Sequence, residues 1–243
     1  MPRPQDQGEA ANADFKTPGL EILVVGLGKT GLSCARYLRA QGVSVAVTDS
    51  RAEPPGLAEL RRELPEVPVF SGGFPPEAFA RASKLVVSPG VPVAEPLIQA
   101  ALAQGIPVLG DVALFAEAAR APICAITGSN GKSTVTTLLG QMAEACGRRV
   151  AVGGNLGEPV LGLLDAAVEL YVVEVSSFQL ETTERLRARA AACLNVSPDH
   201  MDRYPSLDAY AAAKARVYQD AQVALINRDD PRVCAMAPCG VRT

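Results

Sequence analysis

The sequence predicts an α/β fold made of two consecutive parallel-sheet domains. Short apolar runs rich in β-branched residues alternate with longer helical stretches, a pattern typical of strands joined by crossover helices. The runs form two series of five, and a glycine-rich turn follows the first run of each series. With 243 residues, the chain is long enough for two domains that each bury a core.

The first series of runs predicts a Rossmann-like parallel-sheet domain over residues 20–110. Proline and glycine are frequent between the runs, as expected of turns. Residues 1–19 are polar and contain prolines, so we expect a flexible tail there. The predicted strands are Ile22–Val25, Val43–Thr48, Val67–Phe70, Leu85–Val87 and Ile106–Leu109.

The second series predicts a P-loop ATPase-like α/β domain over residues 111–243. No helix or closing strand is evident after Asp230, so we expect the sheet of this central domain to be partial. The predicted strands are Ile123–Thr127, Val150–Val152, Leu170–Val175, Ala191–Val196 and Val223–Asn227.

Composition excludes several classes of function. The formal net charge is −3, with lysine and arginine spread along the chain, so no nucleic-acid footprint is expected. No apolar run approaches the length of a membrane span, and we expect no membrane insertion. The cysteines lie mostly in apolar segments without a C-x-x-C pair, which predicts buried thiols in the reducing cytoplasm. They are Cys34, Cys124, Cys146, Cys193, Cys234 and Cys239.

A first glycine motif, Gly26-Leu-Gly-Lys-Thr-Gly31, matches G-x-G-x-x-G directly after a predicted strand, and Asp49 ends the next strand. This pattern is typical of NAD sites. Its glycines allow a tight turn and the close approach of a pyrophosphate to a helix N-terminus. A UDP-sugar is therefore as compatible with the motif as a dinucleotide, and a purely structural turn is a further alternative. Ser88–Val91 should lie at the same sheet edge, unless it is an ordinary proline turn.

A second glycine motif follows Ile123–Thr127 and precedes a helix predicted over Val135–Cys146. Backbone N–H groups freed by its glycines can face phosphate oxygens, its lysine can reach the outer phosphates, and its serine can bind Mg²⁺. The usual P-loop would need glycine at Ile126, so this loop is shorter. The alternative is a glycine-rich turn with an exposed lysine. The candidate ATP-binding residues are Gly128, Ser129, Asn130, Gly131, Lys132, Ser133 and Thr134.

Two further residues are candidate metal ligands at the same edge. Glu174 lies near the end of an otherwise apolar strand, where a carboxylate is costly unless it is paired or binds a metal. His200, the only histidine, follows the next strand, and Asp199 and Asp202 could orient it. The alternatives are a structurally satisfied carboxylate and a surface histidine.

Lys214 is predicted to face inward. Residues 207–218 have helical periodicity, and Lys214 lies on the apolar stripe seven residues after Leu207. Its side chain could extend to solvent. Alternatively, it could capture CO₂ as a carbamate, which would reverse its charge and create a Mg²⁺ ligand.

Together these motifs resemble the Mur ligase family, and within it the D-glutamate-adding branch. The resemblance spans nearly all of residues 22–230. It rests on the following segments: Gly26-Leu-Gly-Lys-Thr-Gly-Leu-Ser33, Ala125-Ile-Thr-Gly-Ser-Asn-Gly-Lys-Ser-Thr-Val-Thr-Thr137, Val152-Gly-Gly-Asn-Leu-Gly157, Glu174-Val-Ser-Ser-Phe-Gln-Leu-Glu181, Asn195-Val-Ser-Pro-Asp-His-Met-Asp-Arg-Tyr204 and Tyr210-Ala-Ala-Ala-Lys214.

The resemblance implies where the substrates bind. The first domain would hold the UDP part of UDP-N-acetylmuramoyl-L-alanine, and a second group of residues would lie near its muramoyl-alanine end. The UDP candidates are Gly28, Thr30, Gly31, Asp49, Ser50 and Gly90, and the muramoyl-alanine candidates are Asn155, Ser176 and Gln179.

The resemblance also implies an ATP-dependent reaction in peptidoglycan precursor synthesis. ATP would phosphorylate the substrate carboxylate, and the amine of D-glutamate would attack the acyl phosphate. Lys132 would neutralise the transferred phosphoryl group. Ser133 and Glu174 would hold one Mg²⁺, and His200 with carbamylated Lys214 would hold a second.

One departure from the family is expected to matter. Mur ligases have a third, C-terminal domain that supplies most of the amino-acid site, and nothing here corresponds to it. We therefore expect a monomeric N-terminal portion without full activity. The alternative hypotheses for the function are an NAD-dependent dehydrogenase, a non-catalytic nucleotide-binding module and a folate-polyglutamating ligase.

Overall fold

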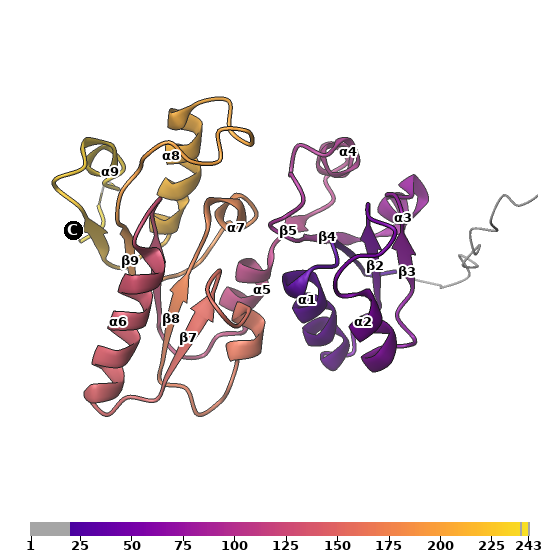
Figure 1. The fold of residues 1–243 in the computed structure, drawn as a ribbon, viewed down its shortest axis with the longest axis horizontal. Coiled ribbons are helices and arrows are strands. Elements are labelled where there is room, and N and C mark those ends of the chain that lie inside the picture. Colours follow the sequence, from indigo (N-terminus) through magenta and orange to yellow (C-terminus); the bar gives the residue numbers. More distant parts are fainter. Residues whose placement is uncertain (1–19, 239, 243) are drawn as a thin grey trace, which may run out of the picture.

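The structure is a computed structural model that describes residues 20–238 and 240–242. The predicted tail at residues 1–19 lies outside the described residues. Figure 1 shows two α/β units, each built around its own sheet. The strand orders are β3-β2-β1-β4-β5 and β10-β9-β6-β8-β7, and all the pairings between these strands are parallel. The predicted fold class, two parallel-sheet α/β domains in sequence, is confirmed.

In the first unit, every predicted run overlaps a strand. Because β1 lies in the middle of the sheet, all of its residues are buried. The elements are β1 (Ile22–Val25), α1 (Lys29–Ala40), β2 (Val45–Asp49), α2 (Leu57–Glu63), β3 (Val69–Ser71), α3 (Pro76–Arg81), β4 (Lys84–Val87), α4 (Pro96–Ala103), β5 (Val108–Leu109) and the connecting helix α5 (Asp111–Ala118).

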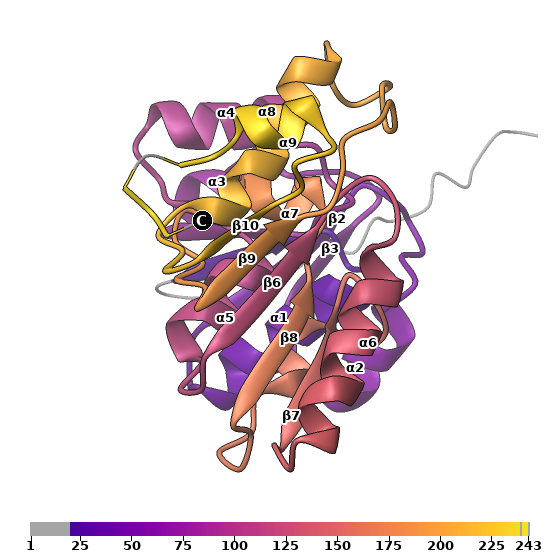
Figure 2. The same cartoon turned by 90° about the vertical axis from the view of Figure 1, so that its left-hand side faces the viewer.

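The second unit also follows the predicted order of strands. Figure 2 shows its sheet with α6 alongside β7 and β8, against which this helix packs. The elements are β6 (Ile123–Thr127), α6 (Lys132–Ala145), β7 (Val150–Gly154), η1 (Val160–Leu163), β8 (Leu170–Glu174), α7 (Ser177–Glu181), β9 (Ala190–Cys193), α8 (Leu207–Ala215), η2 (Arg216–Tyr218), β10 (Ala224–Ile226) and α9 (Pro231–Ala235).

Two details differ from the sequence prediction. Helix α6 begins at Lys132 rather than Val135, because Gly131 takes a left-handed conformation at φ 79° and acts as its N-cap. A short helix, α9, forms after Asp230. The Asp230 carboxylate accepts hydrogen bonds from the N–H groups of Arg232 and Val233, which satisfies the first turn of that helix.

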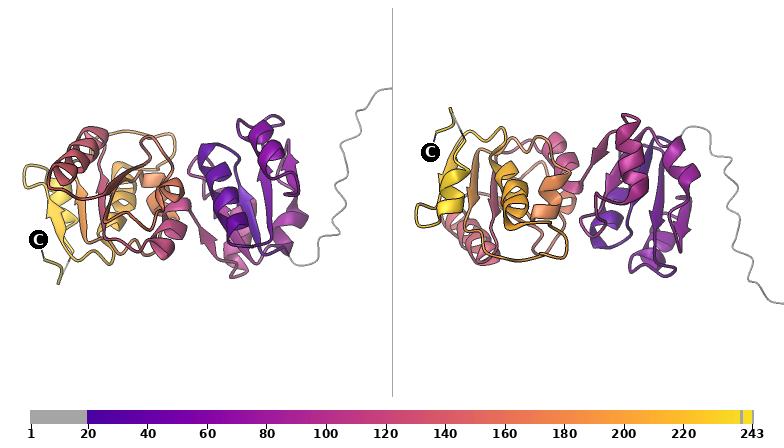
Figure 3. Two further views of the ribbon diagram at one scale, coloured as in Figure 1. Left: turned by 90° about the horizontal axis from the view of Figure 1, so that it is seen from below. Right: turned by 90° about the horizontal axis from the view of Figure 1, so that it is seen from above.

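Figure 3 shows the two units side by side, from below and from above, and buried apolar side chains join them. Helix α1 of the first unit packs against η1 and α5. One continuous buried cluster contains Leu38 of α1, Phe115 of α5 and Val160 of η1. The rings of Phe115 and Tyr171 meet edge to face with centroids 5.0 Å apart. The relative position of the sheets is therefore fixed by packing as well as by the chain connection.

The cysteine prediction is partly wrong. Cys34 and Cys193 are buried and Cys124 is half-buried, but Cys146 and Cys234 are exposed. Cys146 follows the last turn of α6 and Cys234 lies on the short helix α9, so neither faces a core. Cys239 lies outside the described residues. Among the described helices, none combines the length and apolarity that a membrane crossing requires.

We predict that Gly31→Ala destabilises the first unit. A Cβ at Gly31 would lie 1.9 Å from the carbonyl oxygen of Gly26, a backbone atom that cannot move aside. The free energy of unfolding in urea should fall by about 3 kcal/mol, the upper part of the usual range for overpacking. Gly73→Ala is the control, because a Cβ there meets nothing within 4 Å. Equal unfolding midpoints for the two variants would contradict the prediction.

Candidate functional site

The second glycine loop ends at the start of α6. Gly128 and Gly131 have positive φ angles of 152° and 79°, and Gly131, the N-cap, has no side chain to bond the first N–H groups of the helix. Those groups and the helix dipole favour an anion at this point. The Lys132 ammonium lies beside them and donates to the Ser129 carbonyl oxygen at 3.0 Å.

Asn195, which the sequence analysis missed, shapes this loop. Its Oδ1 accepts hydrogen bonds from the N–H groups of Ser129 at 3.1 Å and Asn130 at 2.9 Å. Its Nδ2 donates to the Asn130 carbonyl oxygen at 3.1 Å. These two loop N–H groups are therefore occupied by protein, which leaves the first turn of α6 for phosphate. The available signal was position, since Asn195 follows β9, the neighbour of β6.

Glu174 lies beside the loop because β8 pairs with β6. It is 2 % exposed. Its Oε2 accepts from Ser133 Oγ and its Oε1 from Asn155 Nδ2, both at 2.7 Å. Within the described residues, no group of three or more histidine, cysteine, aspartate or glutamate side chains could hold a metal ion. The carboxylate and hydroxyl oxygens still suit Mg²⁺, which commonly takes one or two carboxylates and completes its shell with phosphate and water.

Lys214 points inward from α8, as its place on the apolar stripe predicts. Its side chain does not extend to solvent, since the residue is 1 % exposed. Its Nζ donates to the Gly128 carbonyl oxygen at 2.8 Å and lies 4.4 Å from the centroid of the Tyr210 ring. Burial, together with the nearby Lys132 charge, lowers the pKa of Lys214 to about 8.

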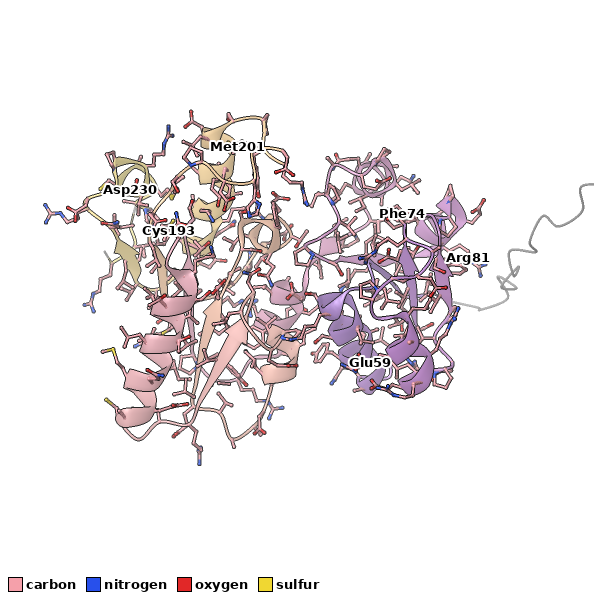
Figure 4. All side chains as sticks on the ribbon, viewed as in Figure 1. Glu59, Phe74, Arg81, Cys193, Met201 and Asp230 are labelled. Carbon is pink, nitrogen blue, oxygen red and sulfur yellow. The ribbon has the colours of Figure 1, made fainter. Side chains whose placement is uncertain are left out.

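His200 lies near the same tyrosine. Its φ is 54°, and its ring centroid is 4.8 Å from that of Phe178 and 6.4 Å from that of Tyr210. Its Nε2 is 3.5 Å from the Asp199 carboxylate. Figure 4 shows the neighbouring Met201 at the top of the second unit and Cys193, which ends β9, lower down. Tyr210 thus contacts both His200 and Lys214.

The first glycine loop follows β1 and faces the loop after β4. Gly26 has φ 95°, and its carbonyl oxygen accepts from Ser88 Oγ at 2.8 Å. A Cβ at Gly28 or Gly90 would meet nothing within 4 Å, so a ligand could approach the backbone there. Gly31 instead serves the close packing described above. Thr30 is half-buried in the first turn of α1, and Ser50 is exposed.

Asp49 holds this loop in place. It is 2 % exposed, and its Oδ2 accepts from the Leu27 N–H at 2.7 Å. The Arg51 guanidinium donates to both of its oxygens, at 2.9 and 2.7 Å. Burial would raise the pKa of Asp49, but the hydrogen bonds from Arg51 and Leu27 outweigh it and lower the pKa to about 2. Its oxygens are thus occupied by protein donors, and Arg51 is a residue that the motif did not reveal.

The candidates for the muramoyl-alanine end lie around the Glu174 turn. Ser176 and Gln179 form a capping box at the start of α7, and the Gln179 amide also donates to Asp111 at 2.9 Å. The two units are linked nearby, because Lys29 of the first glycine loop donates to the carbonyl oxygen of Gly157 in the loop after β7. No sequence motif predicted a role for Lys29 or Asp111.

Family models match both units. Residues 20–110 match "Mur ligase MurD-like, N-terminal domain", and residues 126–239 match "Mur ligase middle domain". The chain belongs to the Mur ligase family. This result confirms the family that the sequence motifs indicated.

Relatives refine the placement within the Mur ligases. The chain is 59% identical over 215 residues to a UDP-N-acetylmuramoylalanine–D-glutamate ligase of Marinobacter nauticus, covering 88% of this chain and 48% of the relative. It is 56% identical over 222 residues to the ligase of the same name from Nitrosococcus oceani, covering 89% and 49%. The chain spans about half the length of the curated relatives it matches.

A solved structure shares the fold. The crystal structure of UDP-N-acetylmuramate:L-alanyl-gamma-D-glutamyl-meso-diaminopimelate ligase from Neisseria meningitides superposes with a TM-score of 0.60 at 17% identity. The superposition covers 93% of this chain and 77% of the other. At this identity the likeness concerns the arrangement of the two sheets.

We predict that burial of Lys214 makes stability depend on pH. The pKa is about 8 in the folded protein against an ordinary value of 10.5, so between these values the unfolded chain binds more protons. The free energy of unfolding of the wild type should therefore rise, relative to Lys214→Met, as the pH increases from about 8 to about 10.5. Urea denaturation of both proteins across this range measures the difference. A constant difference would show that Lys214 titrates normally.

Proposed function

We propose that the protein is an ATP-dependent carbon–nitrogen ligase that adds D-glutamate to UDP-N-acetylmuramoyl-L-alanine in the cytoplasm, a step of peptidoglycan precursor synthesis. The observation that carries the proposal is the meeting of three groups at one sheet edge. The glycine loop runs into the first turn of α6, where Ser133 contacts Glu174, and buried Lys214 donates to the loop at Gly128. The names of the relatives at 59% and 56% identity supply the choice of amino acid.

The first unit would bind the UDP part. The diphosphate would lie at the N-terminus of α1, next to the open backbone at Gly28, with Thr30, Ser50 and Gly90 around the same crevice. Asp49 would act mainly by holding the loop, since its oxygens already accept from Leu27 and Arg51. Arg51, whose side chain is 53% exposed, would support the same loop through its ion pair with Asp49.

The second unit would bind ATP at the loop of residues 128–134. The N–H groups of the first turn of α6 would receive the phosphates, and Lys132 would neutralise the transferred phosphoryl group. Ser133 and Glu174 would hold a Mg²⁺, because their oxygens already meet at 2.7 Å. This cation would neutralise charge as the phosphoryl group is transferred.

Lys214 would carry a carbamate. Its pKa of about 8 leaves an appreciable share of neutral amine near neutral pH, and only the neutral amine reacts with CO₂. The amine nitrogen would form a bond to the CO₂ carbon and release one proton to solvent. The resulting carboxylate-like group and His200, gathered around Tyr210, would hold a second Mg²⁺.

The reaction would proceed by activation of a carboxylate. The γ-phosphoryl group of ATP passes to the alanine carboxylate, and ADP leaves. The amine of D-glutamate then attacks the acyl phosphate and displaces inorganic phosphate, with loss of a proton from nitrogen. Asn155 and Ser176, on either side of Glu174, would orient the muramoyl-alanine end, and Gln179 would support Ser176 through the capping box.

We predict that this chain binds UDP-N-acetylmuramoyl-L-alanine. Calorimetry should show saturable binding, weakened about tenfold by Asp49→Ala, because the first glycine loop loses the acceptor of the Leu27 N–H and about 1.4 kcal/mol with it. Glu77→Ala, which removes an exposed carboxylate on α3, is the matched control. No heat with the UDP-sugar would refute the UDP-site assignment, and binding of NADH instead would favour a dehydrogenase.

We predict a carbamate on Lys214 in bicarbonate buffer near pH 8. Protein equilibrated with ¹³C-bicarbonate should give a carbamate carbon resonance that disappears on acidification, because protonation of the nitrogen releases CO₂. Lys214→Met should lack this resonance, whereas Lys84→Met, which changes a partly exposed lysine, should retain it. A resonance that persists in Lys214→Met would place the modification on another amine.

A further inference from the structure

Asp111 is a buried carboxylate that neither the sequence motifs nor the reaction above uses. It is 1 % exposed and begins α5, directly after the last strand of the first sheet. Burial raises its pKa to about 6, although the hydrogen bond from Gln179 opposes this. Its second oxygen, Oδ1, has no hydrogen-bond partner among the residues that the structure describes. A carboxylate in this setting costs folding free energy, so stability does not account for it.

The contact between Asp111 and Gln179 fixes the orientation of an amide. An ionised carboxylate only accepts hydrogen bonds, so the Gln179 Nε2, 2.9 Å from Asp111 Oδ2, must face it. The Gln179 Oε1 is then directed at Ser176, where it accepts from the N–H at 3.0 Å and from Oγ at 3.2 Å. If the Gln179 amide were reversed, its Nε2–H groups would face the Ser176 N–H and its Oε1 would face Asp111 Oδ2.

The same amide fixes the turn that carries Glu174. Ser176 Oγ accepts from the Gln179 N–H at 3.2 Å, which completes the capping box of α7. Only Val175 separates Ser176 from Glu174, whose carboxylate contacts Ser133 and Asn155. A shift of the turn would therefore move the Glu174 carboxylate away from the phosphate loop.

A second contact holds the start of α5 against the end of α7. The N–H of Gly110 donates to the Thr182 carbonyl oxygen at 3.0 Å. A Cβ at Gly110 would lie 2.2 Å from Thr182 Oγ1, so the two segments are in close contact. Asp111 is thereby held at a fixed distance from Gln179.

We propose that Asp111 is a positioning residue for the ligase reaction, which acts through Gln179 and Ser176 to hold Glu174 where it can bind Mg²⁺ beside Ser133. This rests on the proposed function. It also assigns Gln179 a supporting role, because both ends of its amide are engaged by protein.

The experiment compares Mg²⁺ affinity in three variants of residues 1–243. Asp111→Leu removes the acceptor and keeps the branched shape of the side chain, Asp111→Asn keeps an acceptor for Gln179 Nε2, and Glu117→Gln alters an exposed residue of the same helix. Mg²⁺ is titrated into each protein saturated with ATP, and ATP affinity is measured separately in EDTA. We expect Asp111→Leu to lower the Mg²⁺ affinity about tenfold with ATP affinity in EDTA unchanged, and the other two variants to remain within about twofold of wild type.

Further variants make the outcome decisive. Gln179→Leu should lower the Mg²⁺ affinity by the same factor as Asp111→Leu. The double variant should bind Mg²⁺ no more weakly than either single variant, because both residues act through one contact. If Asp111→Leu does not fold, Gln179→Leu is used for the test. Wild-type Mg²⁺ affinity in the leucine variants, or equal losses in Asp111→Leu and Asp111→Asn, would overturn the proposal. Glu174→Gln is the separate test of the proposed function, which fails if that variant binds Mg²⁺ with wild-type affinity.

Discussion

The site depends on the pair of hydrogen bonds that the buried Glu174 carboxylate accepts from Ser133 and Asn155. A buried charge is costly unless it is compensated, so both donors must reach it from their own segments. Ser133 comes from the first turn of α6, which follows β6 through the glycine loop, and Asn155 comes from the loop after β7, while Glu174 itself ends β8. Parallel strands bring these three ends to one edge of the sheet. The carboxylate then fixes the loops relative to one another before any ligand arrives.

Positive charge gathers opposite this carboxylate. Lys132 and Lys214 both donate to backbone oxygens of the phosphate loop, and the charge of Lys132 contributes to the lowered pKa of Lys214. Two ammonium groups in a partly buried site repel each other. A carbamate on Lys214 would convert this repulsion into attraction and add a negative group for a cation. The burial that makes the lysine costly to charge would therefore favour the neutral amine that a reaction with CO₂ requires.

The sequence predicted what depends on local pattern. The ten strands in the described part of the chain follow from apolar runs, and the burial of Lys214 follows from its place on a helical stripe. Helix α6 begins at Lys132 and not at Val135 as predicted, because Gly131 takes a left-handed conformation and is the N-cap. Asn195 and Asp111 were missed because their partners lie 65 or more residues away in the sequence, and no spacing rule relates them. The motif position of Asp49 predicted a contact with the ligand. In the structure its oxygens instead accept hydrogen bonds from Arg51 and from the Leu27 N–H. Tertiary contacts of this kind carry no periodic signal.

The continuous apolar cluster between the two units has a consequence for folding. Leu38 of α1, Phe115 of α5 and Val160 of η1 belong to one packed group that extends into both sheets. Opening either sheet would expose apolar side chains of the other to water, at a cost that grows with the exposed area. Loss of one core therefore removes part of the stability of its neighbour. The two sheets are expected to denature as one cooperative unit, although each has the architecture of a separate domain.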